Sequence, residues 1–220
     1  MLGELRFNLH NKVSTTGSVA KFFFEGLATD IVGNAYVMAT DDKSPTGAGT
    51  ISKFTPGGER IVFGSVPGTT PGNDLQANWG LAFDSAGNLY AADGAAQTIY
   101  KFAPNGSRTV FVGPSAFAAG EYPVGLAFDS SGNLFVSIET LTDPGVDPIV
   151  YFSPTGVKST FATGLTFPRG LAFDSAGNLF VAEANAIPDG DILEYPAGGG
   201  GPIVFASGFG RPEFLTFGPR

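Results

Sequence analysis

The stretch Gly80-Leu-Ala-Phe-Asp-Ser-Ala-Gly-Asn-Leu-Tyr90 is the clearest guide to the fold, because the chain repeats it almost unchanged. Further copies begin at Gly125 and Gly170, at a spacing of about 45 residues that is typical of propeller repeats. A more divergent copy begins at Gly26, and the start of a fifth begins at Pro212. The chain is therefore an array of one repeated unit.

Each repeat reads as four short strands joined by tight turns. Leu81 and Phe83 alternate with small residues, which is the period of a strand with one small face. In the turn that follows, the Asp84 side chain can accept backbone N–H bonds and Gly87 can take the left-handed conformation. The remaining strands are expected at residues 89–92, at 98–102 and around Phe111.

Four strands per repeat with short turns are typical of the blades of a β-propeller. The alternative, a β-solenoid, usually has shorter rungs without such hairpins. We therefore predict an all-β chain that forms a single β-propeller domain over residues 1–220. The expected repeats are residues 26–65, 80–113, 125–164 and 170–208.

The repeated motif Gly-Leu-Ala-Phe-Asp-Ser-x-Gly-Asn-Leu-Phe/Tyr, followed by Ile-x-x-Phe and a Pro-x-Gly turn, resembles the NHL-repeat family. It is also similar to the related gluconolactonase and regucalcin-like propellers. The resemblance covers about residues 26–217 and implies a ring that usually has six blades. It says little about function, because one fold hosts many activities.

The two ends of the chain do not complete a repeat by themselves. In the C-terminal piece, Leu215 and Phe217 take the places that Leu171 and Phe173 have in a first strand. A composite blade of residues 1–25 and 211–220 would close the ring and remove the open strand edges. We therefore expect five blades, the alternative being an incomplete piece of a six-bladed propeller.

Composition excludes several classes of chemistry. The chain has no cysteine and a single histidine, His10, so disulfides, thiol nucleophiles and histidine-based triads or metal clusters are excluded. The net charge of −8 disfavours nucleic acid as a partner. No apolar run approaches the roughly 20 residues of a membrane span, so we expect no membrane span. We also expect a monomer.

Residues 1–24 carry charged side chains where a signal peptide would need an apolar core. The low lysine content, the absence of cysteine and the many Gly, Ser and Thr residues nevertheless favour an extracytoplasmic location, periplasmic or secreted.

Propellers usually bind ligands over the central channel, at the face where the inner strands begin, which is an argument by analogy of fold. The side chains expected there as ligand-binding residues are Glu25, Asn78, Trp79, Arg169 and Glu213. The loops between second and third strands should open on the same face, and they carry Asp41, Asp42, Asp93, Glu139, Asp143, Asp147, Glu183, Asp189 and Asp191. The mouth of the channel is thus expected to be acidic, with Arg169 as a lone cation that could simply pair with Glu25 or Glu213.

The resemblance to gluconolactonase-like propellers implies a possible metal site. In those relatives an Asn-x-Gly-Leu motif at the start of an inner strand contributes a metal ligand, and Asn78-Trp-Gly-Leu81 matches it. Glu25, Asp93 and Glu183 would have to supply the other oxygen atoms for Ca²⁺. The bound ion could then polarise a lactone carbonyl.

These observations leave three hypotheses for function. The leading one is a non-enzymatic binding or interaction module, whose acidic channel mouth faces a small ligand, a cation or a protein partner. The alternative is a calcium-dependent lactonase-like hydrolase. RNA binding, which has precedent among NHL propellers, is disfavoured because it needs a basic face with stacking aromatic residues.

Overall fold

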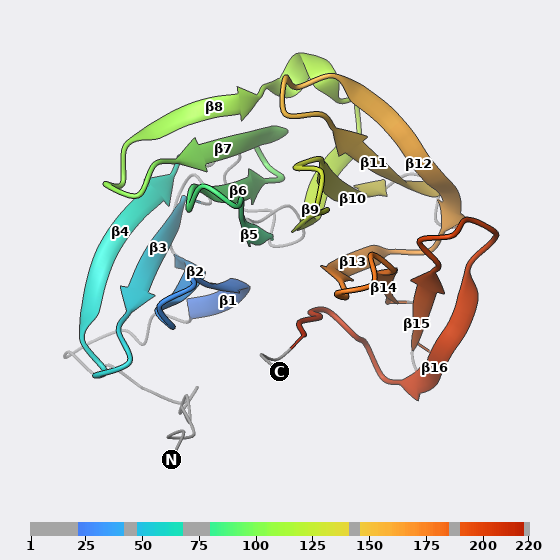
Figure 1. The fold of residues 1–220 in the computed structure, drawn as a ribbon. Helices are drawn as coiled ribbons and strands as arrows, with labels where there is room; N and C mark the ends of the chain where they lie inside the picture. Colours follow the sequence, from blue (N-terminus) through green and yellow to red (C-terminus); the bar gives the residue numbers. More distant parts are fainter. Residues whose placement is uncertain (1–21, 42–47, 68–79, 141–145, 185–189, 218–220) are drawn as a thin grey trace.

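The computed structural model describes residues 22–41, 48–67, 80–140, 146–184 and 190–217. Within these residues, sixteen strands form four antiparallel sheets of four strands each. The sheets follow one another around a common centre, with β1 at one end of the arc and the C-terminal segment, residues 211–217, at the other (Figure 1). The predicted β-propeller architecture is confirmed.

The strands of each blade follow one another in sequence order. Blade one contains β1 (Phe22–Thr29), β2 (Ala35–Asp41), β3 (Gly49–Phe54) and β4 (Arg60–Val66). Blade two contains β5 (Leu81–Phe83), β6 (Leu89–Asp93), β7 (Thr98–Phe102) and β8 (Arg108–Val112). Blade three, preceded by the short 3-10 helix η1 (Pro114–Ala116), contains β9 (Glu121–Phe128), β10 (Leu134–Thr140), β11 (Asp147–Phe152) and β12 (Lys158–Leu165). Blade four contains β13 (Pro168–Phe173), β14 (Leu179–Glu183), β15 (Gly190–Tyr195) and β16 (Ile203–Phe209).

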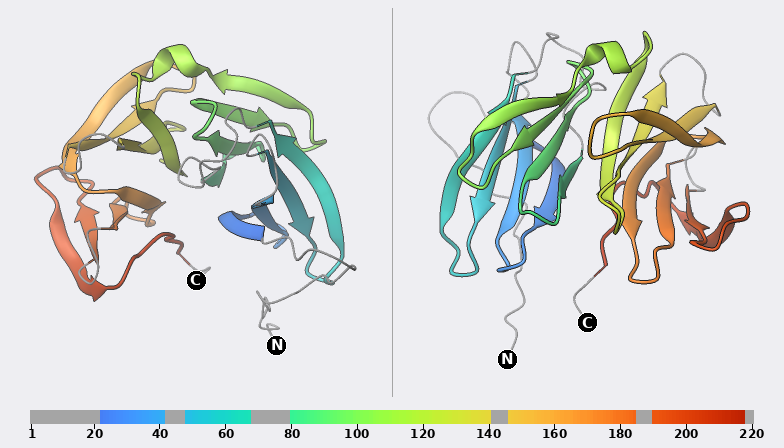
Figure 2. Two further views of the ribbon diagram at one scale, coloured as in Figure 1. Left: turned by 180° about the vertical axis from the view of Figure 1, so that it is seen from behind. Right: turned by 45° about the horizontal axis from the view of Figure 1, so that its top comes forward.

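The first strand of each blade lies nearest the centre and the fourth forms the rim, as both face views show (Figure 1; Figure 2, left). The chain passes from the outer strand of one blade to the inner strand of the next, from β4 to β5, from β8 to β9 and from β12 to β13. Because every blade begins with its inner strand, the starts of all inner strands lie at the centre of the propeller.

The predicted Asp-x-x-Gly-Asn turn joins the first two strands of every described blade. In blade two, Asp84 Oδ1 accepts N–H bonds from Ala86 at 3.0 Å and Asn88 at 2.8 Å. Its Oδ2 accepts a bond from the Asn88 side chain at 2.8 Å, and Gly87 has the left-handed φ of 80° that the turn requires. The same pattern of bonds recurs at Asp30, Asp129 and Asp174.

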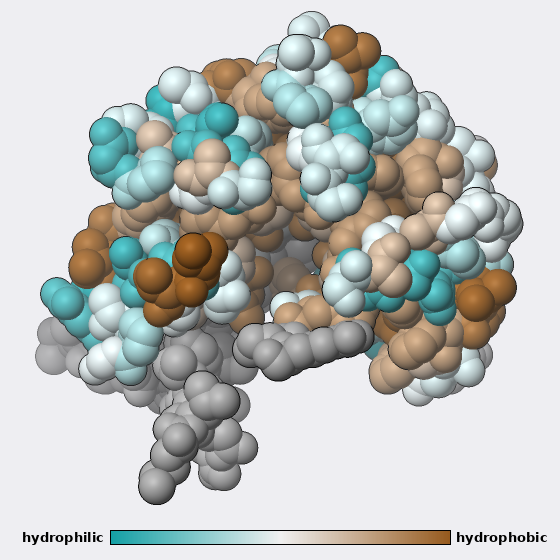
Figure 3. All heavy atoms as spheres, viewed as in Figure 1, coloured by the Kyte–Doolittle hydropathy of each residue, from teal (hydrophilic) through white to brown (hydrophobic). Residues whose placement is uncertain are grey.

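Aromatic rings join each blade to the next. The Tyr90 ring of β6 meets Phe111 of β8 edge-on at a centroid distance of 5.1 Å and Phe128 of the following blade at 4.9 Å. Equivalent pairs of contacts are made by Tyr36, Phe135 and Phe180. Apolar residues accordingly gather between the blades and around the centre of the face shown in Figure 3. The core is therefore a series of interfaces between blades.

The number of blades differs from the prediction. The described residues form four complete blades, where five were expected. The sequence predicted residues 22–25 to lie in the composite blade, but they belong to β1. This strand continues through a bulge between Phe24 and Gly26 and pairs with β2. Residues 1–21 and 218–220 lie outside the described residues, so the composite blade stays a prediction.

Candidate functional site

The inner strands converge on a pocket of about 170 Å³ at the centre of the propeller. Four inner strands and the C-terminal segment contribute to its wall. The lining residues are 26–29 of β1, 80 and 81 at the start of β5, 124–126 of β9, 169–171 of β13 and 213–216. Most of them are Gly, Ala, Val or Leu, and the two charged ones are Arg169 and Glu213.

Glycine at the inner strands keeps this centre narrow. A Cβ atom built on Gly125 would lie 1.8 Å from the carbonyl oxygen of Arg169 in the next inner strand. A Cβ atom on Gly170 would lie 2.8 Å from the backbone nitrogen of Leu215. Backbones thus approach each other at distances that only glycine allows, which explains the small face that the repeated motif shows.

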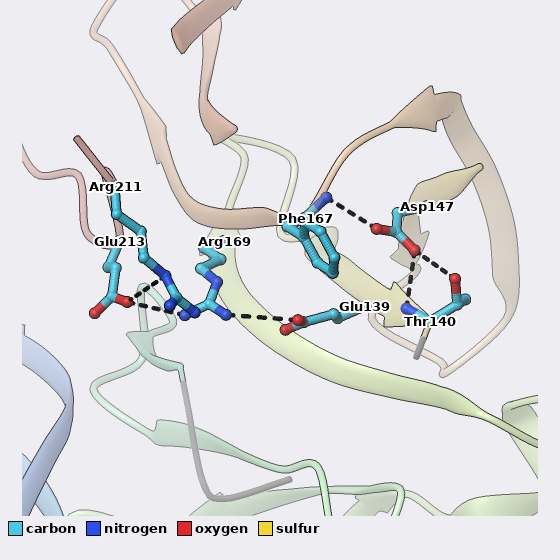
Figure 4. Close-up of polar contacts among 7 residues, drawn as sticks. All are labelled: Glu139, Thr140, Asp147, Phe167, Arg169, Arg211 and Glu213. Carbon is cyan, nitrogen blue, oxygen red and sulfur yellow. Dashed lines mark hydrogen bonds and ion pairs between the residues drawn. The ribbon is translucent and has the colours of Figure 1, made fainter. Parts of the chain in front are cut away.

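Arg169 supplies the buried positive charge of the pocket wall. Its side chain is only 4% exposed, and its Nη1 atom lies 2.9 Å from Oε1 of Glu213. The Nη2 atom lies 3.5 Å from Oε1 of Glu139, a buried residue of β10. Arg211 approaches the same Glu213 oxygen with its Nε atom at 3.2 Å (Figure 4). Because burying a guanidinium is costly unless the charge is paired, these two carboxylates are what permits Arg169 to lie there.

The backbone of Arg169 is fixed as firmly as its side chain. Its carbonyl oxygen accepts a 2.8 Å bond from the hydroxyl of Ser137, which in turn accepts a 2.8 Å bond from the N–H of Gly125. Ser137 therefore ties β9, β10 and β13 together beside the pocket. The guanidinium is held in position before any ligand arrives.

Glu139 is the carboxylate most affected by its surroundings. Burial raises the pKa of this carboxyl above its ordinary value of 4.5, although the positive charge of Arg169 opposes the shift. The negative charge of Asp147 adds to the increase. The two carboxylates, Glu139 and Glu213, thus stand against the two guanidinium groups of Arg169 and Arg211 beside the pocket.

Asp147 fastens the loops beside the site. Its Oδ1 atom accepts bonds from the Thr140 N–H at 2.8 Å and from the Thr140 hydroxyl at 2.6 Å. Its Oδ2 atom accepts a 2.9 Å bond from the N–H of Phe167, a residue with a φ of 50° (Figure 4). One fully buried carboxylate thus joins the end of β10 to the loop that precedes β13.

Asp93 and Glu183, predicted as metal ligands, also hold loops in place. Asp93 is fully buried and its Oδ1 atom accepts a 3.0 Å bond from the N–H of Ala96. Glu183 Oε1 accepts a 2.5 Å bond from the N–H of Thr166, and burial raises the pKa of its carboxyl. Among the described residues, no group of three or more His, Asp or Glu residues is placed to hold a metal ion. Oxygen donors of this kind suit Ca²⁺, but these two carboxylates already accept backbone bonds and belong to no such group.

The structure brings together two of the five predicted ligand-binding residues, Arg169 and Glu213. Glu25 lies in β1 at the bulge, and nothing is described of its side chain. Asn78 and Trp79 lie outside the described residues, so their roles, and the Ca²⁺ site as a whole, stay predictions. Glu139 was among the acidic loop residues expected at the channel mouth, one position beyond the residue aligned with Asp93 and Glu183, whereas no pattern in the sequence pointed to Arg211.

No helix within the described ranges is long and apolar enough to cross a membrane.

No known family model and no curated protein matches the sequence. Solved structures do share its fold. The gluconolactonase of Xanthomonas campestris is 17% identical with a TM-score of 0.60, over 89% of this chain and 69% of that one. The calcium-binding protein regucalcin of Agrobacterium tumefaciens is 14% identical with a TM-score of 0.57, over 83% and 58%. Virginiamycin B lyase of Staphylococcus aureus is 14% identical with a TM-score of 0.53, over 89% and 77%. The chain is thus similar in fold to gluconolactonase, regucalcin and virginiamycin B lyase propellers.

Proposed function

We propose that this protein is a ligand-binding propeller whose site is the central pocket beside Arg169. The observation that carries the proposal is the ion-pair network of Glu139, Arg169 and Glu213, which places fixed charge in a wall otherwise lined by small apolar residues. A concave apolar surface with a few fixed polar groups is the usual form of a small-molecule site.

The size and charge of the pocket define the class of ligand. A volume of about 170 Å³ is below the roughly 300–1,000 Å³ typical of pockets for drug-sized ligands. Glu213 is the partly exposed member of the ion-pair network, and its carboxylate can accept further hydrogen bonds. The site therefore favours a small neutral or cationic molecule that carries N–H or O–H donors, such as an amine or a polyol.

Thermal unfolding with a panel of small amines, polyols and carboxylates of matched size tests this proposal, since a ligand that binds only the folded state raises the Tm. We expect amines or polyols to raise the Tm of the wild-type protein, and carboxylates to leave it unchanged. The substitution Glu213→Gln should reduce that increase. The matched control is Glu59→Gln, which makes the same change in the exposed turn between β3 and β4.

The proposal is wrong if no amine or polyol shifts the Tm. It is also wrong if the shift in the Glu213→Gln variant equals the shift in the Glu59→Gln control.

A calcium-dependent lactonase is the second candidate, favoured by the similarity in fold to a gluconolactonase and to regucalcin. The motif Asn78-Trp-Gly-Leu81 supports it from the sequence. Its test is lactone hydrolysis with Ca²⁺ and with EDTA, in the wild-type protein and in Asn78→Ala. Hydrolysis that needs Ca²⁺ and is lost in Asn78→Ala would replace the binding-module proposal with the lactonase.

The similarity to virginiamycin B lyase brings no third candidate. A histidine-to-alanine variant of that lyase is described as catalytically inactive, whereas this chain has a single histidine, His10, which precedes β1.

A further inference from the structure

The C-terminal segment occupies the place of a fifth inner strand. Phe217 meets the Phe180 ring edge-on at 5.1 Å, as Phe128 meets Tyr90 at 4.9 Å between blades two and three. Leu215 packs against the buried cluster that Phe180 forms with Ala182 and Ile192. The segment also lines the pocket together with β1, β5, β9 and β13. Five inner segments of the described chain therefore surround the centre.

Phe214 shows where this series of inner segments stops. It occupies the position of the glycines at 80, 125 and 170, which let the next inner strand approach closely. Its side chain is 50% exposed, and it lines the pocket with residues 26–29 of β1. A phenylalanine at this position excludes the close backbone approach that the glycines allow, and β1 lines the same pocket.

Outside the C-terminal segment, no described strand covers the apolar side chains that face the gap between blade four and β1. Phe205 is 62% exposed and Phe217 is 50% exposed, although the equivalent Phe111 and Phe128 are partly buried between blades. At the other end of the arc Leu27 is 53% exposed, whereas the equivalent Leu126 is 6% exposed. Apolar side chains are thus left open on both sides of one gap in the arc, and such patches mark surfaces that bind something.

We infer that residues 1–21 of this chain cover that surface and supply outer strands of a fifth blade, whose innermost strand is residues 212–217. Every described connection between blades leads from an outer strand to the next inner strand. The segment that enters β1 is by this rule an outer strand of the preceding blade. Within it, Leu5, Phe7 and Leu9 alternate with Arg6 and Asn8, the period of a strand with one apolar face.

Hydrogen exchange of the full chain tests the inference, with residues 203–217 as the region observed. One variant carries Leu5→Ser, Phe7→Ser and Leu9→Ser, which removes the apolar face of the segment. The matched control carries Arg6→Ser, Asn8→Ser and His10→Ser, which changes the alternate positions. We expect exchange at residues 203–217 to become about tenfold faster in the first variant only, with residues 89–112 unchanged in both. Light scattering should show a monomer throughout.

Two results would overturn the inference. Equal exchange at residues 203–217 in both variants would mean that the apolar face of the N-terminal segment does not cover them. A dimeric mass of the wild-type protein, with residues 203–217 losing protection on dilution to the monomer, would identify a second copy as the occupant. Neither result bears on ligand binding beside Arg169, which is tested separately.

Discussion

The interface between blades two and three and the open face of blade four carry aromatic residues at equivalent positions, but differ in what the described residues place over them. Tyr90 lies between Phe111 and Phe128, both partly buried, and behind them Phe152 is completely enclosed. Phe180 has the equivalent neighbours Phe205, which is 62% exposed, and Phe217, which is 50% exposed. Much of the surface that a blade buries is therefore buried against the blade that follows it. The same residue contributes more to the free energy of unfolding where a following blade covers it than where none does.

The largest expected effect comes from truncating a ring that is enclosed beside a covered interface, compared with truncating a ring of the open face. Phe152→Ala should lower the free energy of unfolding by about 3–5 kcal/mol, because the ring is fully buried and a cavity remains. Phe205→Ala, made in the variant that carries Leu5→Ser, Phe7→Ser and Leu9→Ser so that the N-terminal segment does not cover the ring, removes a ring that is mostly in solvent, and the loss should be about 1 kcal/mol or less. Urea unfolding of the two variants measures both values, and equal losses would contradict the comparison.

A smaller effect is expected for the turns. In Asp84→Ala, the N–H groups of Ala86 and Asn88 and the Asn88 side chain lose their acceptor, at a cost of about 1–3 kcal/mol. The same change at Asp174, whose turn lies at the end of the array, should cost less. Chemical denaturation of both variants checks this order, and a larger loss for Asp174→Ala would show that blade four is not the weaker part.

How much the sequence could reveal depends on the range of the interactions. The strands and the Asp84–Asn88 turn were predicted correctly because alternation and turn chemistry act within a few residues. The pairing of Arg169 with Glu213 was among the predicted alternatives because the repeat aligns their positions. Glu139 and Arg211 were missed as partners because only the tertiary fold brings them to Arg169 and Glu213. The number of blades was wrong for the described residues because ring closure depends on the angle between blades, which no local pattern contains.

The smallest expected effect is on pH dependence. The raised pKa of Glu139 means that the folded state binds its proton more tightly than the unfolded state does. The free energy of unfolding therefore increases as the pH falls from 7 through the raised pKa of Glu139 towards the ordinary value of 4.5. The raised pKa of Glu183 has an effect in the same direction. The Glu139→Gln variant should show a smaller increase in the free energy of unfolding between pH 7 and pH 4.5 than the wild-type protein. The control variant Glu59→Gln should show the same increase as the wild-type protein.

The turn carboxylates act in the opposite direction at lower pH. Burial raises the pKa of Asp84, but the hydrogen bonds from Asn88 outweigh it and the pKa falls below its ordinary value of 3.8. Its stabilisation is present above 3.8 and is lost as the pH falls through the lowered pKa. Stability should therefore be greatest in mild acid, and unfolding curves from pH 7 to 3 that decline steadily would contradict this.

Native-state hydrogen exchange of the variant that carries Leu5→Ser, Phe7→Ser and Leu9→Ser, resolved by strand, is the closest test of the claim that each blade depends on the cover of the next. We expect the slowest exchange in β6, β10 and β11, which lie beside covered interfaces, and measurably faster exchange in β15 and β16. Exchange in β15 and β16 of this variant that is as slow as in β10 would contradict the claim, because blade four would then lose nothing when the cover of the following blade is removed.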